Sequence, residues 1–277
     1  MSEERAQTVG RVGIEDLLAW YRDAGVDEAL TDEPVDRFAE TERLESERKE
    51  AAAARASAAS APKTRTAAAP PPRPHAKGVA DKAAVAEAER LAADAGDLVT
   101  LRDAIEGFEG CDLKRSARKL VFAAGKPAPL MIVGDVPDRD EDADGAPFTG
   151  RAGELLDRML GAIGHSRNDS YLATALPWRT PGQRGPTPHE SAVLRPFVLR
   201  HIALAAPQVL LLMGGTACDL VLNRRFPAAR GSWHDATFGD ATVPVLATFH
   251  PRLLLTQPEQ KRLAWRDLQT LRERLAA

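Results

Sequence analysis

Four short apolar runs recur in the second half of the chain, and enough residues for a helix separate each from the next. They are LMIV (130–133), YLATA (171–175), VLLLM (209–213) and VPVLAT (243–248). Strands that are buried on both faces read as continuous apolar runs, and strands that alternate with helices favour a parallel sheet. The pattern therefore predicts a three-layer α/β/α fold with a central, mainly parallel four-stranded sheet.

Helical periodicity fills the intervals between these runs. Residues 150–164 (GRAGELLDRMLGAIG) supply one helix, and residues 189–206 (HESAVLRPFVLRHIALAA) supply another. A further helical pattern extends from about Ala83 to Gly107, and a final helix begins near Pro258 and continues to the C-terminus. The intervals thus contain the crossover helices that parallel strands need.

The first third of the chain has a different composition. From Ile14, apolar residues at i, i+3, i+4 and i+7 predict a short helix within residues 1–30. Residues 31–78 are rich in alanine, proline and charge, and this composition cannot bury a core, so we expect a disordered linker. The folded domain is expected to occupy residues 79–277, and the helix within 1–30 is a candidate for binding a protein partner.

Charge is distributed unevenly along the chain. Residues 1–60 contain 8 basic and 15 acidic residues, a net charge of −7, whereas the remaining residues have a net charge of +4. The basic remainder permits contact with phosphate groups but does not require it. The N-terminus has no apolar stretch typical of a signal peptide, and no run approaches the ~18 apolar residues of a membrane span. We therefore expect no membrane association and a cytoplasmic location.

The two cysteines do not form a metal-binding pattern. Cys111 and Cys218 are far apart in the sequence, and neither belongs to a CxxC pair. A disulfide scaffold is not expected in a chain of this length with so few cysteines. We interpret both as buried thiols and expect no metal site.

Four loops are expected to meet at one edge of the sheet, because ligands of open parallel sheets bind outside the carboxyl ends of the strands. These loops are GDVPDRDED (134–142), PWRTPGQRGPTP (177–188), GGTAC (214–218) and FHPR (249–252). Each is rich in glycine, proline or charge. The topology alone therefore predicts that the site is assembled from these segments.

Three sequence blocks occur in and around these loops in a fixed order. The chain reads GDVPDRDEDADGAPFTGRAGELLDRML, then YLATALPWRTPGQRGPTP, then LATFHP. This order resembles the family 4 uracil-DNA glycosylases, which typically read GEAPG, ED and PF-GRAG, then a strand ending in asparagine, a RPPGNR-PTP loop, and a strand ending in HP. The resemblance covers Cys111 to about Leu271. The same segment also resembles a branch of this family that lacks the iron–sulfur cluster and is common in alphaproteobacteria.

The chain departs from the iron–sulfur members of that family at the cluster ligands. Those members carry four cysteines, and the corresponding positions here are Phe108, Cys111, Trp178 and Leu194. A 4Fe–4S cluster normally takes four thiolates, and one thiolate cannot hold it. We therefore expect side-chain packing to fill this place, and we expect no metal or organic cofactor.

The resemblance implies roles for three groups that could act on the glycosidic bond. His250 would stabilise the departing base anion through a hydrogen bond to O2 of the base, as an oxyanion hole does. Glu141 and Asp135 are candidates to orient water or to stabilise the positive charge on the sugar. Glu141 is favoured of the two, because it keeps the family's residue whereas Asp135 replaces a glutamate.

Further residues would bind the base and the strand. Phe148 would stack on a flipped base, and Thr174 would meet its polar edge in place of the usual asparagine. One hydroxyl cannot reproduce the two contacts of a carboxamide, so discrimination between uracil and cytosine should weaken. The other candidates to line the base pocket are Gly134, Val136 and Pro137. The candidates to contact phosphates are Arg151, Arg179, Arg184 and Arg252.

The implied function is a DNA-repair glycosylase that hydrolyses the N-glycosidic bond of uracil, and of other deaminated bases, in DNA. Two alternatives stay open. The altered first motif and Thr174 are compatible with a catalytically weakened paralogue that binds damaged or abasic DNA. The N-terminal helix is compatible with an adaptor that recruits a protein partner. The expected partner is DNA, and the expected state is a monomer associated with the nucleoid.

Overall fold

The computed structural model describes residues 81–276. The helix expected within residues 1–30 and the linker expected at 31–78 lie outside the described residues. The described part begins with three helices, α3 (Lys82–Asp94), α4 (Leu98–Gly107) and α5 (Leu113–Ser116).

The helical pattern predicted from Ala83 to Gly107 is two helices rather than one. Asp97 ends the continuity, because its carboxylate accepts the backbone N–H of Thr100 at 2.7 Å while the Thr100 hydroxyl accepts the N–H of Asp97. This reciprocal capping box starts a new helix.

The sheet has six strands in the order β1-β3-β2-β4-β6-β5. The strands are β1 (Ala123–Ala124), β2 (Leu130–Gly134), β3 (Ser170–Thr174), β4 (Val209–Met213), β5 (Trp233–Phe238) and β6 (Ala241–Thr248). The four predicted strands, β2, β3, β4 and β6, are confirmed, and they are parallel to one another. Two antiparallel edge strands, β1 and β5, extend the sheet beyond the predicted four.

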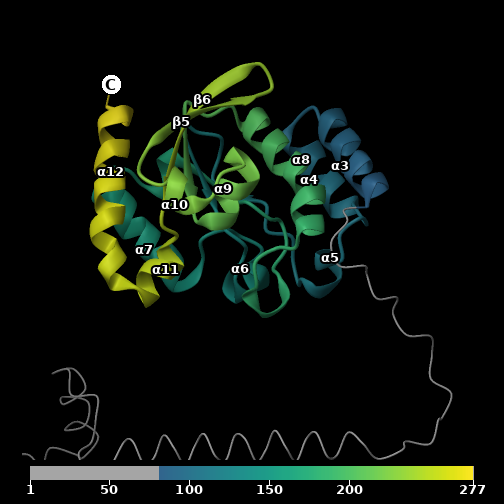
Figure 1. Ribbon diagram of the computed structural model, residues 1–277, viewed down its shortest axis with the longest axis horizontal. Coiled ribbons are helices and arrows are strands. Elements are labelled where there is room, and N and C mark those ends of the chain that lie inside the picture. Colours follow the sequence, from purple (N-terminus) through teal and green to yellow (C-terminus); the bar gives the residue numbers. More distant parts are fainter. Residues whose placement is uncertain (1–80, 277) are drawn as a thin grey trace, which may run out of the picture. The chain divides into compact units, whose positions relative to one another are not determined.

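The remaining elements connect and cover these strands. The helices are α6 (Arg139–Asp144), α7 (Gly150–Gly161), α8 (Pro188–Ala205), α9 (Gly215–Leu222), α10 (Phe226–Ala229), α11 (Pro251–Thr256) and α12 (Lys261–Leu275). The short 3₁₀ turns are η1 (Arg167–Asp169), η2 (Pro181–Gln183) and η3 (Pro258–Gln260). Figure 1 shows α7, α11 and α12 beside one face of the sheet and α3, α4 and α8 beside the other.

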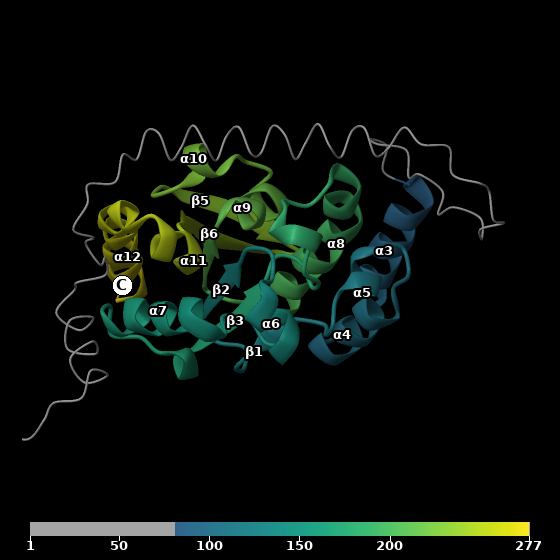
Figure 2. The same cartoon turned by 90° about the horizontal axis from the view of Figure 1, so that it is seen from below.

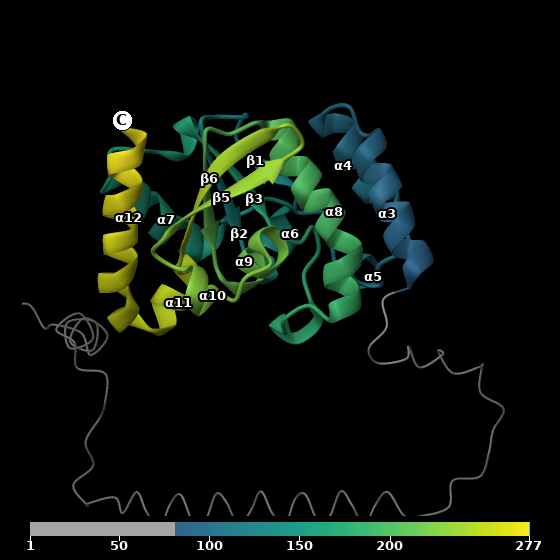
Figure 3. The same cartoon turned by 45° about the horizontal axis from the view of Figure 1, so that its top comes forward.

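Alternate residues of the central strands enter two separate cores. Met131 and Val133 of β2 pack with α3, α4, α8 and α9, whereas Leu130 and Ile132 pack with α7 and α12. All four side chains are essentially inaccessible to solvent, and each such burial contributes about 1.5–3 kcal/mol. Figure 3 shows the resulting three layers, with the sheet between the two sets of helices. Within residues 81–276 no helix is both long and apolar enough to cross a membrane.

Candidate active site

The loops that follow β2, β3, β4 and β6 meet at the carboxyl edge of the sheet, as the parallel topology requires. Figure 2 views the molecule from this side and shows α6, α9 and α11 around the strand ends. The predicted site residues of the first and last loops come together here.

Phe148 and His250 form an adjacent pair of rings at this edge. Their ring centroids are 5.4 Å apart, and the ring planes are inclined by only 12°. Both side chains are buried, Phe148 completely and His250 almost completely. Phe148 comes just before α7 and His250 just before α11, so the two helices bring residues 102 positions apart into contact.

Gly134, the last residue of β2, lies beneath both rings. A Cβ atom at this position would lie 2.8 Å from Cζ of Phe148 and 3.4 Å from Nε2 of His250. A side chain here would therefore collide with the ring of Phe148. The glycine lets the strand backbone approach the ring pair closely, which is one of the established uses of glycine.

Burial keeps the His250 ring neutral, and its hydrogen bond determines which nitrogen carries the proton. Nδ1 accepts the backbone N–H of Arg252 at 3.1 Å, which caps α11. Burial lowers the pKa of His250 to about 3, and the positive charge of Arg252 lowers it further. At neutral pH the ring is therefore uncharged with its proton on Nε2, the nitrogen that lies 3.4 Å from the Cβ position of Gly134.

Glu141 holds the loop that carries Phe148. One carboxylate oxygen accepts the N–H of Phe148 at 2.6 Å, and the other accepts the N–H of Asp138 at 2.8 Å. Burial raises the pKa of Glu141 to about 7, although both backbone hydrogen bonds oppose the rise. The carboxylate thus acts on the backbone of the site, and its predicted role toward water or the sugar stays a prediction.

Asp135 reaches across to the start of α9. Its Oδ1 accepts the N–H of Thr216 at 2.8 Å, and the residue before the helix, Gly214, has no side chain to do so. Burial raises the pKa of Asp135, and its hydrogen bonds to Thr216 partly oppose this. Asp135 therefore caps α9 from the loop that follows β2.

Val136 and Pro137 complete the first loop, and both are buried. The carbonyl of Val136 accepts two long hydrogen bonds, of 3.3 and 3.4 Å, from the guanidinium of Arg252. This contact ties the loop after β2 to α11, so the segments that carry the ring pair are linked at a second point.

Thr174 ends β3 directly beside Gly134, its partner in the strand register. Its hydroxyl donates to the carbonyl of Leu176 at 2.8 Å and lies 3.2 Å from the carbonyl of Val121. The single hydroxyl hydrogen is therefore used within the protein, which leaves only lone pairs for a base.

Three of the four candidate phosphate-binding arginines are in ion pairs. Arg179 Nε lies 3.2 Å from buried Asp142, and Arg184 makes two hydrogen bonds, of 2.6 and 2.7 Å, to Glu190. Arg252 lies 3.8 Å from Asp138. Arg151, on the first turn of α7, is exposed and has no ion pair within the described residues. Of the four, Arg151 has the guanidinium most available to a phosphate.

The four positions that correspond to cluster ligands are all buried in the core on the α8 side of the sheet. Phe108 packs edge-on against Phe197, with ring centroids 5.3 Å apart. Burial raises the pKa of the Cys111 thiol to about 11. One protonated thiol beside Phe108, Trp178 and Leu194 does not match the ligand set of an iron–sulfur cluster. Residues 81–276 contain no group of three or more His, Cys, Asp or Glu that could hold a metal ion.

A buried ion pair lies behind His250, and sequence reasoning missed it. Arg230 makes hydrogen bonds of 2.9 and 3.1 Å to Asp267 of α12, and the Thr248 hydroxyl donates to the same carboxylate at 2.8 Å. The guanidinium also lies 5.2 Å from the ring centre of Phe249. The network thus holds the two residues that precede His250. The sequence did contain a signal for this network, because Asp267 occupies a position at which the apolar periodicity of the final helix predicts a buried side chain.

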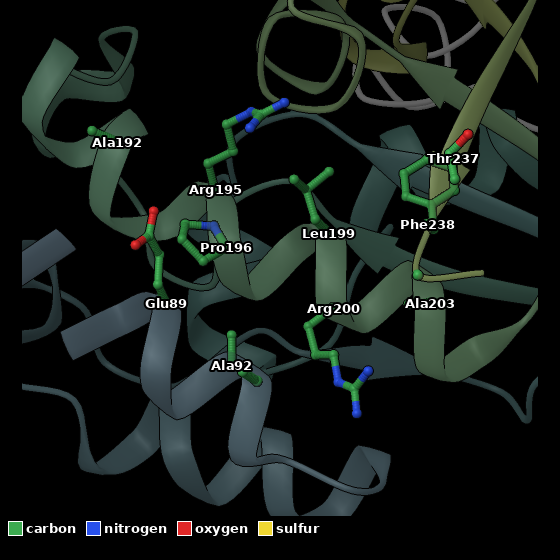
Figure 4. A pocket seen from close by; sticks show the side chains of 12 residues that line it. Glu89, Ala92, Ala192, Arg195, Pro196, Leu199, Arg200, Ala203, Thr237 and Phe238 are labelled. Carbon is green, nitrogen blue, oxygen red and sulfur yellow. The ribbon is translucent and has the colours of Figure 1, made fainter. Parts of the chain in front are cut away.

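A surface hollow of about 400 Å³ lies away from this site, between α3, α8 and the β5–β6 turn (Figure 4). Two arginines on its wall are already engaged, because Arg195 donates to the carbonyl of Leu220 and Arg200 to that of Ala95. The hollow is at the amino end of β6, opposite to His250. It is therefore separate from the ring pair.

Comparisons with known proteins place the chain in a family. Residues 122–269, which contain all four loops, match the family profile described as the uracil DNA glycosylase superfamily. The chain is 32% identical over 156 residues to the type-4 uracil-DNA glycosylase of Archaeoglobus fulgidus, covering 54% of this chain and 78% of that protein. It is also 32% identical over 165 residues to the Thermotoga maritima protein of that name, with coverages of 57% and 84%. The Saccharolobus solfataricus protein of that name is 25% identical over 189 residues, with coverages of 65% and 88%.

Proposed function

Since the chain belongs to the uracil DNA glycosylase superfamily, we propose that it is a DNA-repair enzyme that hydrolyses the N-glycosidic bond of uracil in DNA. The observation that carries the proposal is the ring pair of Phe148 and His250 above Gly134. A flat aromatic ring suits a flat base, and a neutral imidazole with a proton on Nε2 suits an anion that forms beside it.

In the proposed reaction the target nucleotide leaves the base stack and enters the site. Both rings are buried, so the loops at the strand ends must shift to admit the base. The bond between C1′ and the base nitrogen breaks, and its electron pair leaves with the base. Negative charge then develops on the O2 atom of uracil, and the Nε2–H of His250 donates a hydrogen bond to it.

Water completes the reaction by forming a bond to C1′, and its proton passes to solvent or to the released base. Asp135 and Glu141 lie on the loop beside the ring pair and are the proposed acidic groups. Both are partly committed to backbone N–H groups, so we propose that their ionised forms act chiefly through the negative charge they place near the sugar. For Glu141 this form becomes the main one only above about pH 7. Arg151 is the proposed contact to a phosphate of the bound strand.

The proposal is tested by an excision assay with the full-length protein. An end-labelled oligonucleotide that contains one uracil is incubated with the enzyme, and alkali then cleaves the strand at any abasic site. We expect cleavage at the uracil and no cleavage when thymine occupies the same position. Cytosine at that position should be cleaved more slowly than uracil, because a single hydroxyl at residue 174 discriminates less between the two bases than a carboxamide. Binding to uracil or abasic DNA without excision would instead favour the weakened paralogue.

Replacement of Thr174 with asparagine is expected to raise uracil excision about tenfold. Asparagine offers two amide hydrogens and a separate oxygen, so it can retain the hydrogen bond to Leu176 and still pair with the polar edge of uracil. A buried polar edge without a partner costs about 1–3 kcal/mol, and 1.4 kcal/mol corresponds to a factor of ten.

The measurement is the single-turnover rate on uracil-containing single strands. Thr174→Val is the matched control, since it keeps the shape of threonine without the hydroxyl and should show no gain. A rate for Thr174→Asn at or below the parental rate would reject the role of residue 174 at the base edge.

A further inference from the structure

Phe148 adopts a backbone conformation that a large side chain rarely takes. Its φ angle is +54°, in the left-handed region that favours glycine. Such a conformation is strained and persists only where the surroundings enforce it. The residue proposed to stack on the base therefore needs groups that hold its backbone.

Two ionisable side chains hold the peptide groups on either side of Phe148. Glu141 accepts its N–H at 2.6 Å, as described above. On the other side, Nη2 of Arg167 donates to the Phe148 carbonyl at 2.6 Å. Hydrogen bonds that involve a charged partner are roughly twice as strong as neutral ones. The two contacts together fix the orientation of both peptide planes.

Arg167 is itself held in place from α7. Its Nε forms an ion pair with Asp157, and its side chain is about two-thirds buried, with 33% exposure. Gly153 of the same helix allows this arrangement. A Cβ atom there would lie 1.9 Å from the Phe148 carbonyl oxygen and 2.6 Å from Nη2 of Arg167. The carbonyl and the guanidinium thus occupy the space above this glycine.

We propose that Arg167 is a positioning residue, which holds Phe148 in the left-handed conformation and so presents its ring to the flipped base. The part of this inference that has Phe148 stacking on a base rests on the proposed function. The part that has Arg167 holding the Phe148 backbone rests only on the contacts described above. The simple alternative is that Arg167 only joins η1 to α7 through Asp157, and it predicts a change in stability with no change at the ring.

The first arm of the test follows the ring directly and needs no catalysis. The protein is labelled with 4-fluorophenylalanine, and the ¹⁹F resonance of Phe148 is assigned with Phe148→Leu. We expect Arg167→Met to shift or broaden this resonance while the other phenylalanine resonances stay in place. Arg158→Met is the matched control, because Arg158 is also on the α7 side, is 71% exposed, and pairs only with Glu154 and its carbonyl.

The second arm measures excision with the same variants. We expect Arg167→Met to lower the single-turnover rate about tenfold with less than a twofold change in KM, and Arg167→Lys to restore part of the rate. If Arg167→Met is too unstable to study, Asp157→Asn should move the same resonance less far. An unchanged Phe148 resonance in folded Arg167→Met or Asp157→Asn would overturn the proposal. If the parental protein does not excise uracil, the proposed function is wrong. The first arm still decides whether Arg167 holds Phe148 in place, because it does not depend on catalysis.

Discussion

Replacement of His250 with alanine is expected to slow uracil excision about 10²–10³-fold, the cost of removing one oxyanion donor in other enzymes. In the proposed reaction the neutral ring donates Nε2–H to the anion of the base, and alanine offers no donor in its place. Binding to uracil-containing DNA should change little, because the imidazole is buried and meets no phosphate. The measurements are single-turnover rates and a binding titration at fixed salt.

His189→Ala is the control for this variant, since His189 is a partly exposed histidine on the first turn of α8, away from the ring pair, and its ring accepts only the backbone N–H of Asp81. Its excision rate should equal the parental rate. Because His250 also caps α11, His250→Ala is expected to be somewhat less stable, so its rate is measured at a temperature at which thermal denaturation shows the variant to be folded. A parental rate in folded His250→Ala would show that the histidine is structural and that another donor stabilises the base.

Replacement of Arg230 with methionine is expected to lower the free energy of unfolding by about 3 kcal/mol. Removing one partner of a buried ion pair leaves the other charge uncompensated, which costs about 3–5 kcal/mol. The lower end applies because the Arg230 side chain is 24% exposed, whereas that of Asp267 is only 4% exposed. For a domain of this size the melting temperature should fall by about 6–12 °C, as measured by thermal denaturation.

The double variant Arg230→Met with Asp267→Leu separates charge from packing. Because it removes both charges, it should be more stable than Arg230→Met alone. Arg272→Met, at an exposed position of α12, is the control and should melt within about 2 °C of the parental protein. If Arg230→Met has the same melting temperature as the parental protein, then Asp267 finds another partner or becomes protonated without a loss of stability.

The sequence was sufficient for the central sheet because each buried strand is a continuous apolar run. It was not sufficient for β5, whose sequence WHDATF mixes aromatic, charged and small residues and is only partly buried. That pattern is difficult to distinguish from a polar loop. The two residues of β1 are too few for any periodicity. Edge strands were therefore missed for a physical reason, since they bury only part of their surface.

The site shows the same division between local pattern and long-range contact. Parallel topology predicted that the loops of Phe148 and His250 would meet, and they do. It could not predict that Arg179 and Arg184 would be engaged by Asp142 and Glu190, because those partners are set by tertiary packing. An exposed and a paired arginine look identical in a sequence.

Arg167 was missed for a further reason. It contacts a backbone carbonyl 19 positions earlier, and such a contact requires no particular residue type at the acceptor. No motif or spacing marks it. The strain at Phe148 that gives the contact its importance is likewise a property of the backbone angle rather than of the residue type.

The carboxyl group of Glu141 couples the folding of the domain to proton uptake. Its pKa is about 7 in the folded protein, against an ordinary value of 4.5. Between these two values the folded state retains a proton that the unfolded chain has released, so folding absorbs protons in this window. The contribution of Glu141 to stability is therefore complete below about pH 4.5 and declines as the pH rises through 7. Near neutral pH the loop that presents Phe148 thus exchanges between a protonated and an ionised anchor.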